Sequence, residues 1–332
     1  MSMTDATRKK PLMHTMTFAV AATLALSAAQ VQAQAWPSRP IRMIVAQAPG
    51  GSGDLMARVT AANLSERLGV PVVVENKPGG AFIIGTEAVA RAAPDGYTLL
   101  HTSMQGLGIF PTAEKLPYDP DRDLQPIAMV AFVDSLIAIS SKLGAKNLKE
   151  FIAIAKARPG QLTYGSSGPG SVSHFNLELF RLRTGVDALH VPFKGGMAAL
   201  AETVAGRIDV ALTGTLGVSQ HIASGAIVPL ASLGKKRSRI LPDIPTMVEL
   251  GYPDALGGTW YGVIAPAGMP QPVVRRLAKE IGDAAASPKF AEQTAKVGQE
   301  IRIELLDEFA RTIAAERRLW HAVAKEANIK LE

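Results

Sequence analysis

The sequence predicts an α/β protein built from two doubly wound domains. Short apolar runs alternate with stretches of helical spacing along most of the chain, and this is the order of strand–helix–strand units. The pattern occurs once before and once after Gln125, and each occurrence contains a glycine-rich loop. A chain of 332 residues fits about two domains of roughly 100–200 residues each. One large doubly wound sheet is the alternative that these observations leave open.

The amino-terminal residues have the three-part form of a secretory signal peptide. A basic segment at 8–10 precedes an apolar stretch at 12–29, and a small-residue pattern ends at Ala33. We therefore expect a leader of residues 1–33, cleaved after Ala33 or Ala35, and export to the periplasm. A membrane anchor is the alternative, which the short stretch rich in Ala and Thr disfavours.

Before Gln125, three apolar runs are expected to be strands separated by two helices. Pro94-Asp95-Gly96 ends the second helix and opens the third strand. The order of these elements predicts parallel strands. The expected strands are 41–46, 70–75 and 97–102, and the expected helices lie near 55–62 and 81–92.

After Gln125, a long β-like run at 127–139 is interrupted by Asp134. Pro159-Gly160 and Gly185 each end a helix. The further expected strands are 162–164, 188–191, 208–212, 228–233 and 259–265, and the expected helices are 148–155, 175–182 and 197–205. Residues 270–329 are expected to form two or three helices.

Two crossing strands, near 127–133 and 258–264, are expected to join the domains. The predicted boundaries place residues 34–130 and 260–332 in the first lobe and residues 131–259 in the second. The carboxyl-terminal helices are then expected to pack on the first lobe.

The composition excludes several classes of function. The chain has no cysteine, so disulfides, thiolate metal sites and a cysteine nucleophile are excluded. Its net charge of +6 is not gathered into a long basic run, and aromatic residues make up 5%, so we expect no nucleic acid partner. No histidine pair has metal-helix spacing, and Asp119, Asp121 and Asp123 occupy a turn expected to face water, so we expect no metal.

Two glycine-rich loops repeat one local design. Residues 46–54 and 165–174 each follow an expected strand and lead into an expected helix. Glycines let the backbone approach a ligand, and a helix start offers free N–H donors that favour an anion. Ordinary tight turns would have the same form, but the recurrence with several serines favours a ligand.

The loops lack the signatures of nucleotide sites. Neither has the lysine of a phosphate-binding loop, and neither has the third glycine of a dinucleotide loop, so we expect no cofactor. A small carboxylate fits better. The chain also lacks a G-x-S-x-G elbow and an evident pair of nucleophile and base, so we do not expect an enzyme.

The first loop and an ordered set of later motifs resemble the substrate-binding proteins of tripartite tricarboxylate transporters, also called Bug receptors. The motifs run in order along nearly the whole mature chain: Pro-Gly-Gly at 49–51 with Asp54, Glu-Asn-Lys-Pro-Gly at 75–79, Pro-Asp-Gly-Tyr-Thr-Leu-Leu at 94–100, Tyr-Asp-Pro at 118–120, His-Val-Pro-Phe-Lys-Gly at 190–195, Leu-Pro-Asp-Ile-Pro-Thr at 241–246 and Ala-Pro-Ala-Gly-Met-Pro at 265–270.

This resemblance implies a two-lobed periplasmic-binding-protein (Venus flytrap) fold with a cleft between its domains. It implies a receptor that captures a small carboxylate and delivers it to polytopic membrane permease subunits. Backbone groups and water would hold the carboxylate, without an arginine clamp. The implied binding positions are Ala48, Gly51, Ser52, Asp54, Ser167, Gly168, Ser171 and His174, then Thr102, Ser103 and Gln105 after the third strand, with Lys194 and Thr213 as weaker candidates.

The chain departs from the family pattern at three places. Bulky residues replace a glycine-rich run at 81–84, Phe110-Pro111 replaces the usual Asn-Pro, and Gln47 stands where an aromatic or aliphatic residue is common. Trp260 and Tyr261 would meet an apolar ligand body or, as we expect, pack at the second crossing. The ligand therefore stays open among mono-, di- and tricarboxylates, amino acids and aromatic acids. An exported enzyme acting on small acids, or a sensor of the same ligands, is the alternative function.

Overall fold

The computed structural model describes residues 36–112, 116–214, 218–238, 240–296 and 298–329. The chain divides into a unit ending at Ser38 and a unit of Arg39–Glu332, and the elements below belong to the second. The expected leader of residues 1–33 lies outside the described residues. No helix among the described residues is both long and apolar enough to cross a bilayer.

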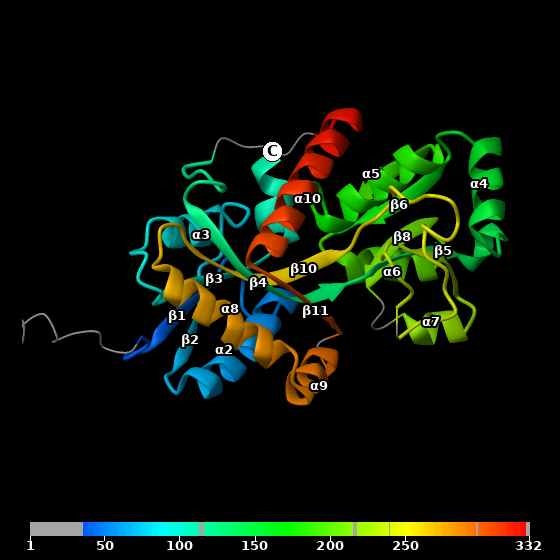
Figure 1. Cartoon of the computed structure of the whole chain (residues 1–332). Helices are drawn as coiled ribbons and strands as arrows, with labels where there is room; N and C mark the ends of the chain where they lie inside the picture. Colours follow the sequence, from blue (N-terminus) through cyan, green and yellow to red (C-terminus); the bar gives the residue numbers. More distant parts are fainter. Residues whose placement is uncertain (1–35, 113–115, 215–217, 239, 297, 330–332) are drawn as a thin grey trace, which may run out of the picture. The chain divides into compact units, whose positions relative to one another are not determined.

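Two mixed β-sheets organise an α/β two-lobed fold (Figure 1). The first has six strands in the order β11-β4-β10-β3-β1-β2, and the second has five in the order β7-β6-β8-β5-β9. The two sheets exclude the alternative of one large doubly wound sheet. The first sheet comprises β1 (Ile41–Val45), β2 (Val72–Asn76), β3 (Thr98–Ser103), β4 (Leu124–Val133), β10 (Thr259–Pro266) and β11 (Glu300–Leu305). The second comprises β5 (Ser135–Ser140), β6 (Leu162–Ser166), β7 (Ala188–Pro192), β8 (Val210–Gly214) and β9 (Ile227–Ser232).

Each sheet combines parallel strands with antiparallel ones. As the strand–helix order predicts, β1 pairs in parallel with β2 and β3, and β6 pairs in parallel with β7 and β8. In contrast, β10 is antiparallel to both β3 and β4, and β5 is antiparallel to β8 and β9. The crossing strands run against the strands beside them, and this is why neither sheet is purely parallel.

Helices α2 (Ser52–Leu68) and α5 (Val172–Thr184) follow the two glycine-rich loops. The carboxyl-terminal helices α8 (Gln271–Ala285) and α10 (Leu306–Glu326) contact β4, as expected for packing on the first sheet. The other helices are α3 (Ile83–Ala90), α4 (Leu148–Ala157), α6 (Gly196–Val204), α7 (Ser219–Ala223) and α9 (Pro288–Lys296), with short helical turns at Gln105–Ile109, Phe110–Thr112 and Ser141–Leu143.

The strand β11 was not expected, because the tail was assigned to helices alone. Its residues Ile301, Ile303 and Leu305 alternate with charged ones, which is the period of a strand with two different faces. It pairs with β4 and extends the first sheet.

The two crossings lie close together. β4 and β5 form one run that only Asp134 interrupts, and β10 returns beside β4. Gly258, just before β10, has φ +136°, and a Cβ there would lie 2.7 Å from the Val133 carbonyl oxygen. Glycine therefore permits the close approach of the two crossing segments.

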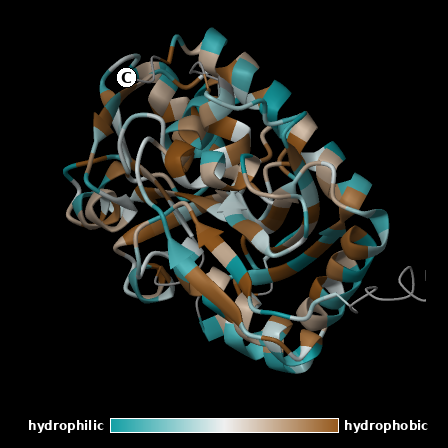
Figure 2. Ribbon diagram, turned by 90° about the vertical axis from the view of Figure 1, so that its left-hand side faces the viewer, coloured by the Kyte–Doolittle hydropathy of each residue, from teal (hydrophilic) through white to brown (hydrophobic). Residues whose placement is uncertain are grey.

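Apolar side chains of the sheets form the cores. Trp260 on β10 is fully buried and packs edge-to-face on Phe309 of α10, with ring centroids 4.9 Å apart. In Figure 2 hydrophobic colour follows the strands, whereas hydrophilic colour follows the outer turns of many helices. This amphipathic pattern is what anchors the carboxyl-terminal helices to the first sheet.

Candidate functional site

A cavity of about 440 Å³ is lined by residues from both glycine-rich loops. Ser52 begins α2 after the first loop, and Ser167 lies in the loop before α5. Thr213, near the end of β8, also lines the cavity. The remaining lining residues are Val133, Ser135, Val172, Ser173, Gly196, Met197, Leu212, Gly214, Thr259, Tyr261, Gly298 and Gln299.

The lining is polar without being charged. None of these described residues is Asp, Glu, Lys, Arg or His, whereas seven carry a hydroxyl group. Hydroxyls and the N–H groups at the starts of α2 and α5 can donate to an anion without a cation. The arrangement suits a small anion with an apolar body.

Two residues outside the implied binding positions hold the first loop. Gln299 precedes β11, and its Nε2 donates to the Ser52 carbonyl oxygen at 3.2 Å. The Tyr261 hydroxyl forms a hydrogen bond with Ser52, and burial raises the pKa of Tyr261 to about 12 although this bond lowers it. Tyr261 therefore stays protonated at neutral pH. Trp260 next to it turns into the core instead.

The second loop is held by a chain of hydroxyls. The Ser167 backbone N–H donates to Ser173 Oγ at 2.8 Å, and the two hydroxyls lie 2.7 Å apart. Ser173 Oγ is 3.1 Å from Ser171 Oγ, which in turn donates to the Gly168 carbonyl at 2.7 Å. Gly168 has φ +113°, a conformation that favours glycine. The exposed Ser167 is thus presented from a fixed loop.

Ser171 and His174 are committed to the loop itself. Ser171 caps α5 by accepting from the His174 backbone N–H at 3.2 Å. His174 Nδ1 accepts from the Gly170 N–H at 3.2 Å, and its ring stacks on His190 with centroids 4.1 Å apart. Burial and the neighbouring His190 lower the pKa of His174 to about 4, so the ring is neutral. Neither residue lines the cavity.

Asp54 is likewise internal to the first loop. It is buried and accepts hydrogen bonds from the Gly50 N–H at 2.9 Å, from Arg58 at 3.0 Å and from Asn76 at 2.9 Å. Burial alone would raise its pKa, but the hydrogen bonds from Arg58, Gly50 and Asn76 outweigh burial and lower it. Asp54 is therefore ionised and stabilises the loop conformation, and it does not line the cavity.

The other expected positions also lie off the cavity lining. Thr102 and Ser103 are buried at the end of β3, and the Thr102 hydroxyl has no hydrogen-bond partner among the described residues. Gln105 begins the next helical turn, and Lys194 is exposed. The structure also places Ala48, Gly51 and Gly168 off this lining. The role of all these residues in binding stays a prediction.

One serine–histidine pair has hydrogen-bonding distance. Ser166 Oγ lies 2.5 Å from His190 Nε2, a relation that the sequence did not reveal. Ser166 is fully buried and also accepts from the Gly168 N–H at 3.1 Å. In a pair of nucleophile and base, the nucleophile must be accessible and a third group must orient the base. Ser166 is buried, and no described residue hydrogen-bonds the other nitrogen of His190. Within the described residues, no cluster of three or more His, Cys, Asp or Glu side chains could hold a metal.

Residues 56–329 match the model of the tripartite tricarboxylate transporter family receptor. The chain belongs to this receptor family. Protein BugT of Bordetella pertussis is 39% identical over 310 residues, which cover 92% of this chain and 94% of that protein.

Two solved structures have the same fold as this chain. The periplasmic binding protein BugD is 33% identical with a TM-score of 0.70, and the match covers 90% of this chain and all of that one. The R. palustris protein Rpa4515, solved with adipate, is 31% identical with a TM-score of 0.73, and covers 89% of this chain and 99% of that one. The family resemblance and the α/β two-lobed fold predicted from the motifs are thereby confirmed.

Proposed function

We propose that this family receptor is exported to the periplasm and captures a small organic carboxylate in the cavity lined by Ser52, Ser167 and Thr213. One observation carries the proposal, namely that a single uncharged cavity is shared by both glycine-rich loops. The N–H groups at the starts of α2 and α5 and the nearby hydroxyls would bind the carboxylate. The adipate of Rpa4515 supports a carboxylate as the ligand class.

The same proposal includes two lobes that close on the ligand. The lobes would comprise residues 34–130 with 260–332, and residues 131–259. A ligand with higher affinity for the closed state would shift the molecule toward closure. The closed receptor would then deliver its carboxylate to polytopic membrane permease subunits.

A thermal-shift and calorimetric titration with adipate and other mono-, di- and tricarboxylates tests the capture. A ligand at 100 times its dissociation constant stabilises the protein by about 2.7 kcal/mol. The Ser52→Glu variant should lose the binding, because a carboxylate would enter the anion site. Ser219→Glu is the matched control, because Ser219 is exposed on α7 and lines no part of this cavity.

Equal binding by both variants would show that the cavity is not the site. Turnover of a bound carboxylate would contradict a receptor. Delivery is tested by uptake: cells lacking this protein should lose uptake of the ligand, and the wild-type gene but not Ser52→Glu should restore it.

A further inference from the structure

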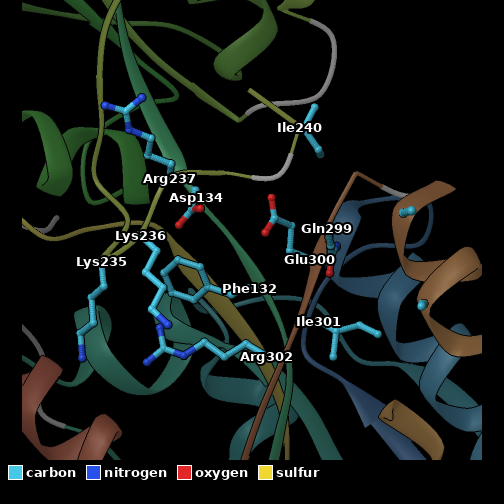
Figure 3. A pocket seen from close by; sticks show the side chains of 12 residues that line it. Phe132, Asp134, Lys235, Lys236, Arg237, Ile240, Gln299, Glu300, Ile301 and Arg302 are labelled. Carbon is cyan, nitrogen blue, oxygen red and sulfur yellow. The ribbon is translucent and has the colours of Figure 1, made fainter. Parts of the chain in front are cut away.

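A second cavity of about 600 Å³ adjoins the first, and Gln299 lines both. Its walls come from the end of β4 with Asp134, from the segment after β9, and from α9 and β11 (Figure 3). Unlike the first cavity, it is lined by charged side chains of both signs.

One part of this cavity presents hydrogen-bond acceptors that lack donors. Figure 3 shows the Glu300 carboxylate pointing toward Asp134. Among the described residues, Asp134 forms no hydrogen bond or ion pair, and Glu300 accepts only from Ser238 Oγ at 2.7 Å. Gln299 is 3% exposed, and because its Nε2 is held by the Ser52 carbonyl, its Oε1 is left without a partner. Leaving the Gln299 oxygen buried without a donor is costly, and the partly exposed Asp134 and Glu300 carboxylates place two negative charges at this part of the cavity, which favours a cationic donor.

Another part of the cavity presents cations. Lys235 and Lys236 are exposed and form no ion pair with any described residue. Arg302 lies over the Phe132 ring, 5.0 Å from its centroid, and pairs with Glu304. In Figure 3 the side chains of Lys235, Lys236 and Arg302 extend to the lower left, whereas Asp134 and Glu300 lie above Phe132.

We propose that this second cavity binds a zwitterionic small molecule that carries an ammonium group and a carboxylate, of the class of apolar α-amino acids. An ammonium has three N–H donors and fits the Asp134 and Glu300 carboxylates. The ligand's carboxylate meets Lys236 and its neighbours. The apolar body lies against Phe132, Ile240 and Ile301, which also line the cavity.

The two charged parts select against simpler ligands. A plain carboxylate would gain Lys236 but face Asp134 and Glu300, and a plain amine would face Lys235 and Lys236. Burial and the nearby Glu300 raise the pKa of Asp134 to about 6, although Arg302 opposes them. A bound ammonium would relieve this cost of ionising Asp134. This site is separate from the proposed carboxylate site, and its test does not depend on that function.

The test is calorimetric titration of the whole protein with L-alanine, L-leucine and L-phenylalanine at millimolar concentrations. The analogues 4-methylpentanoate and 3-methylbutylamine lack the ammonium and the carboxylate of L-leucine, respectively. We expect L-leucine to bind and each analogue to bind about tenfold more weakly, as for the loss of one charged hydrogen-bonding group.

Glu300→Gln and Lys236→Gln should each weaken L-leucine binding about tenfold. Glutamine at 300 keeps an acceptor for Ser238, and Lys236 is exposed, so both variants should fold. Lys149→Gln on α4 is the matched control, because Lys149 is exposed and forms no ion pair with a described residue.

Three results would overturn the proposal. The first is no binding of any of the three amino acids by the wild-type protein. The second is equal binding of L-leucine and 4-methylpentanoate, which would leave an anion site. The third is L-leucine binding that Ser52→Glu abolishes while Glu300→Gln leaves it unchanged, which would place the amino acid in the carboxylate cavity.

Discussion

The ring of Phe82 packs against the ring of Phe110, with centroids 5.8 Å apart and planes tilted by 40°. These residues lie in two of the three segments that depart from the family's motifs. Phe82 is buried in the αL conformation before α3, with φ +76°, and Phe110 follows the turn after β3. The two departures are therefore one packing unit, in which bulk gained at one segment is matched at the other.

This pairing predicts coupling between the two positions. Phe82→Ala should lower the free energy of unfolding by about 3 kcal/mol, the lower end for a buried phenylalanine. Phe110→Ala should cost less, because Phe110 is only partly buried. The double variant should fall short of the sum by about 0.5–1.5 kcal/mol. Urea unfolding of the four proteins measures this coupling, and additive losses would show that the rings do not stabilise each other.

Tyr261 connects the crossing strand β10 to the ligand cavity through Ser52. Tyr261→Phe removes the hydroxyl that hydrogen-bonds Ser52 but keeps the ring. We expect the affinity for a carboxylate to fall about fivefold, equivalent to about 1 kcal/mol, with a similar or smaller loss of stability.

Titration calorimetry of Tyr261→Phe checks the affinity, and Tyr252→Phe serves as control because Tyr252 lines neither cavity. Unchanged affinity in Tyr261→Phe would mean that Ser52 is positioned by Gln299 alone.

Much of the fold was predictable because apolar runs and helix stops are local signals. The strand break at Asp134 and the ends of β1, β3 and β6 agree with the sequence within two residues. The alternation of apolar and charged residues around Ile301 is a strand pattern, but it lies between two helices of the tail and was therefore assigned to helix. With it the sequence missed Gln299, which lies just before that strand.

The site was less predictable, because it depends on which face of a strand meets the cavity. The ladder of β10 with β4 shifts register between Tyr261 and Gly262 and again between Val263 and Ile264. Such irregularities decide whether a side chain points to the core or to the cavity, and no local pattern reveals them. Asp54 and His174 were expected to bind the ligand, but both form hydrogen bonds within their own loops. The sequence cannot separate these two roles, because a polar residue beside a glycine-rich loop can bond the loop's backbone as readily as a ligand.

The neutral His174 predicts a pH-dependent difference between the wild-type protein and His174→Asn. Its pKa is about 4 in the folded protein and about 6.5 when unfolded. Between these values the unfolded state binds a proton that the folded state does not, so this histidine destabilises the fold as the pH falls below about 6.5. Asparagine does not titrate and keeps an acceptor for Gly170.

Relative to the wild-type protein, His174→Asn should therefore gain about 2 kcal/mol of unfolding free energy between pH 7 and pH 5. Comparison of the two proteins cancels the titrating groups that do not contact His174, whereas the adjacent His190 contributes to the difference. Denaturant unfolding at each pH provides the measurement. A difference independent of pH would mean that His174 is protonated equally in both states.

Glu316 on α10 predicts a pH dependence of opposite sign. One of its oxygens accepts from the indole N–H of the buried Trp260, and burial raises its pKa to about 7 although this bond lowers it. Because the pKa is raised on folding, the proton binds more tightly to the folded state. The stability contributed by this proton is present at low pH and is lost as the pH rises through about 7.

Glu316→Gln keeps an acceptor for Trp260 without ionising, so its stability should exceed that of the wild-type protein increasingly between pH 5 and pH 8. Part of the Glu316 side chain is exposed, so the slope of this difference should stay below the limit of about 1.4 kcal/mol per pH unit for one proton. Thermal unfolding of the two proteins across this range measures the slope, and a wild-type protein that gains stability relative to Glu316→Gln as the pH rises would show that the folded protein favours the ionised carboxylate.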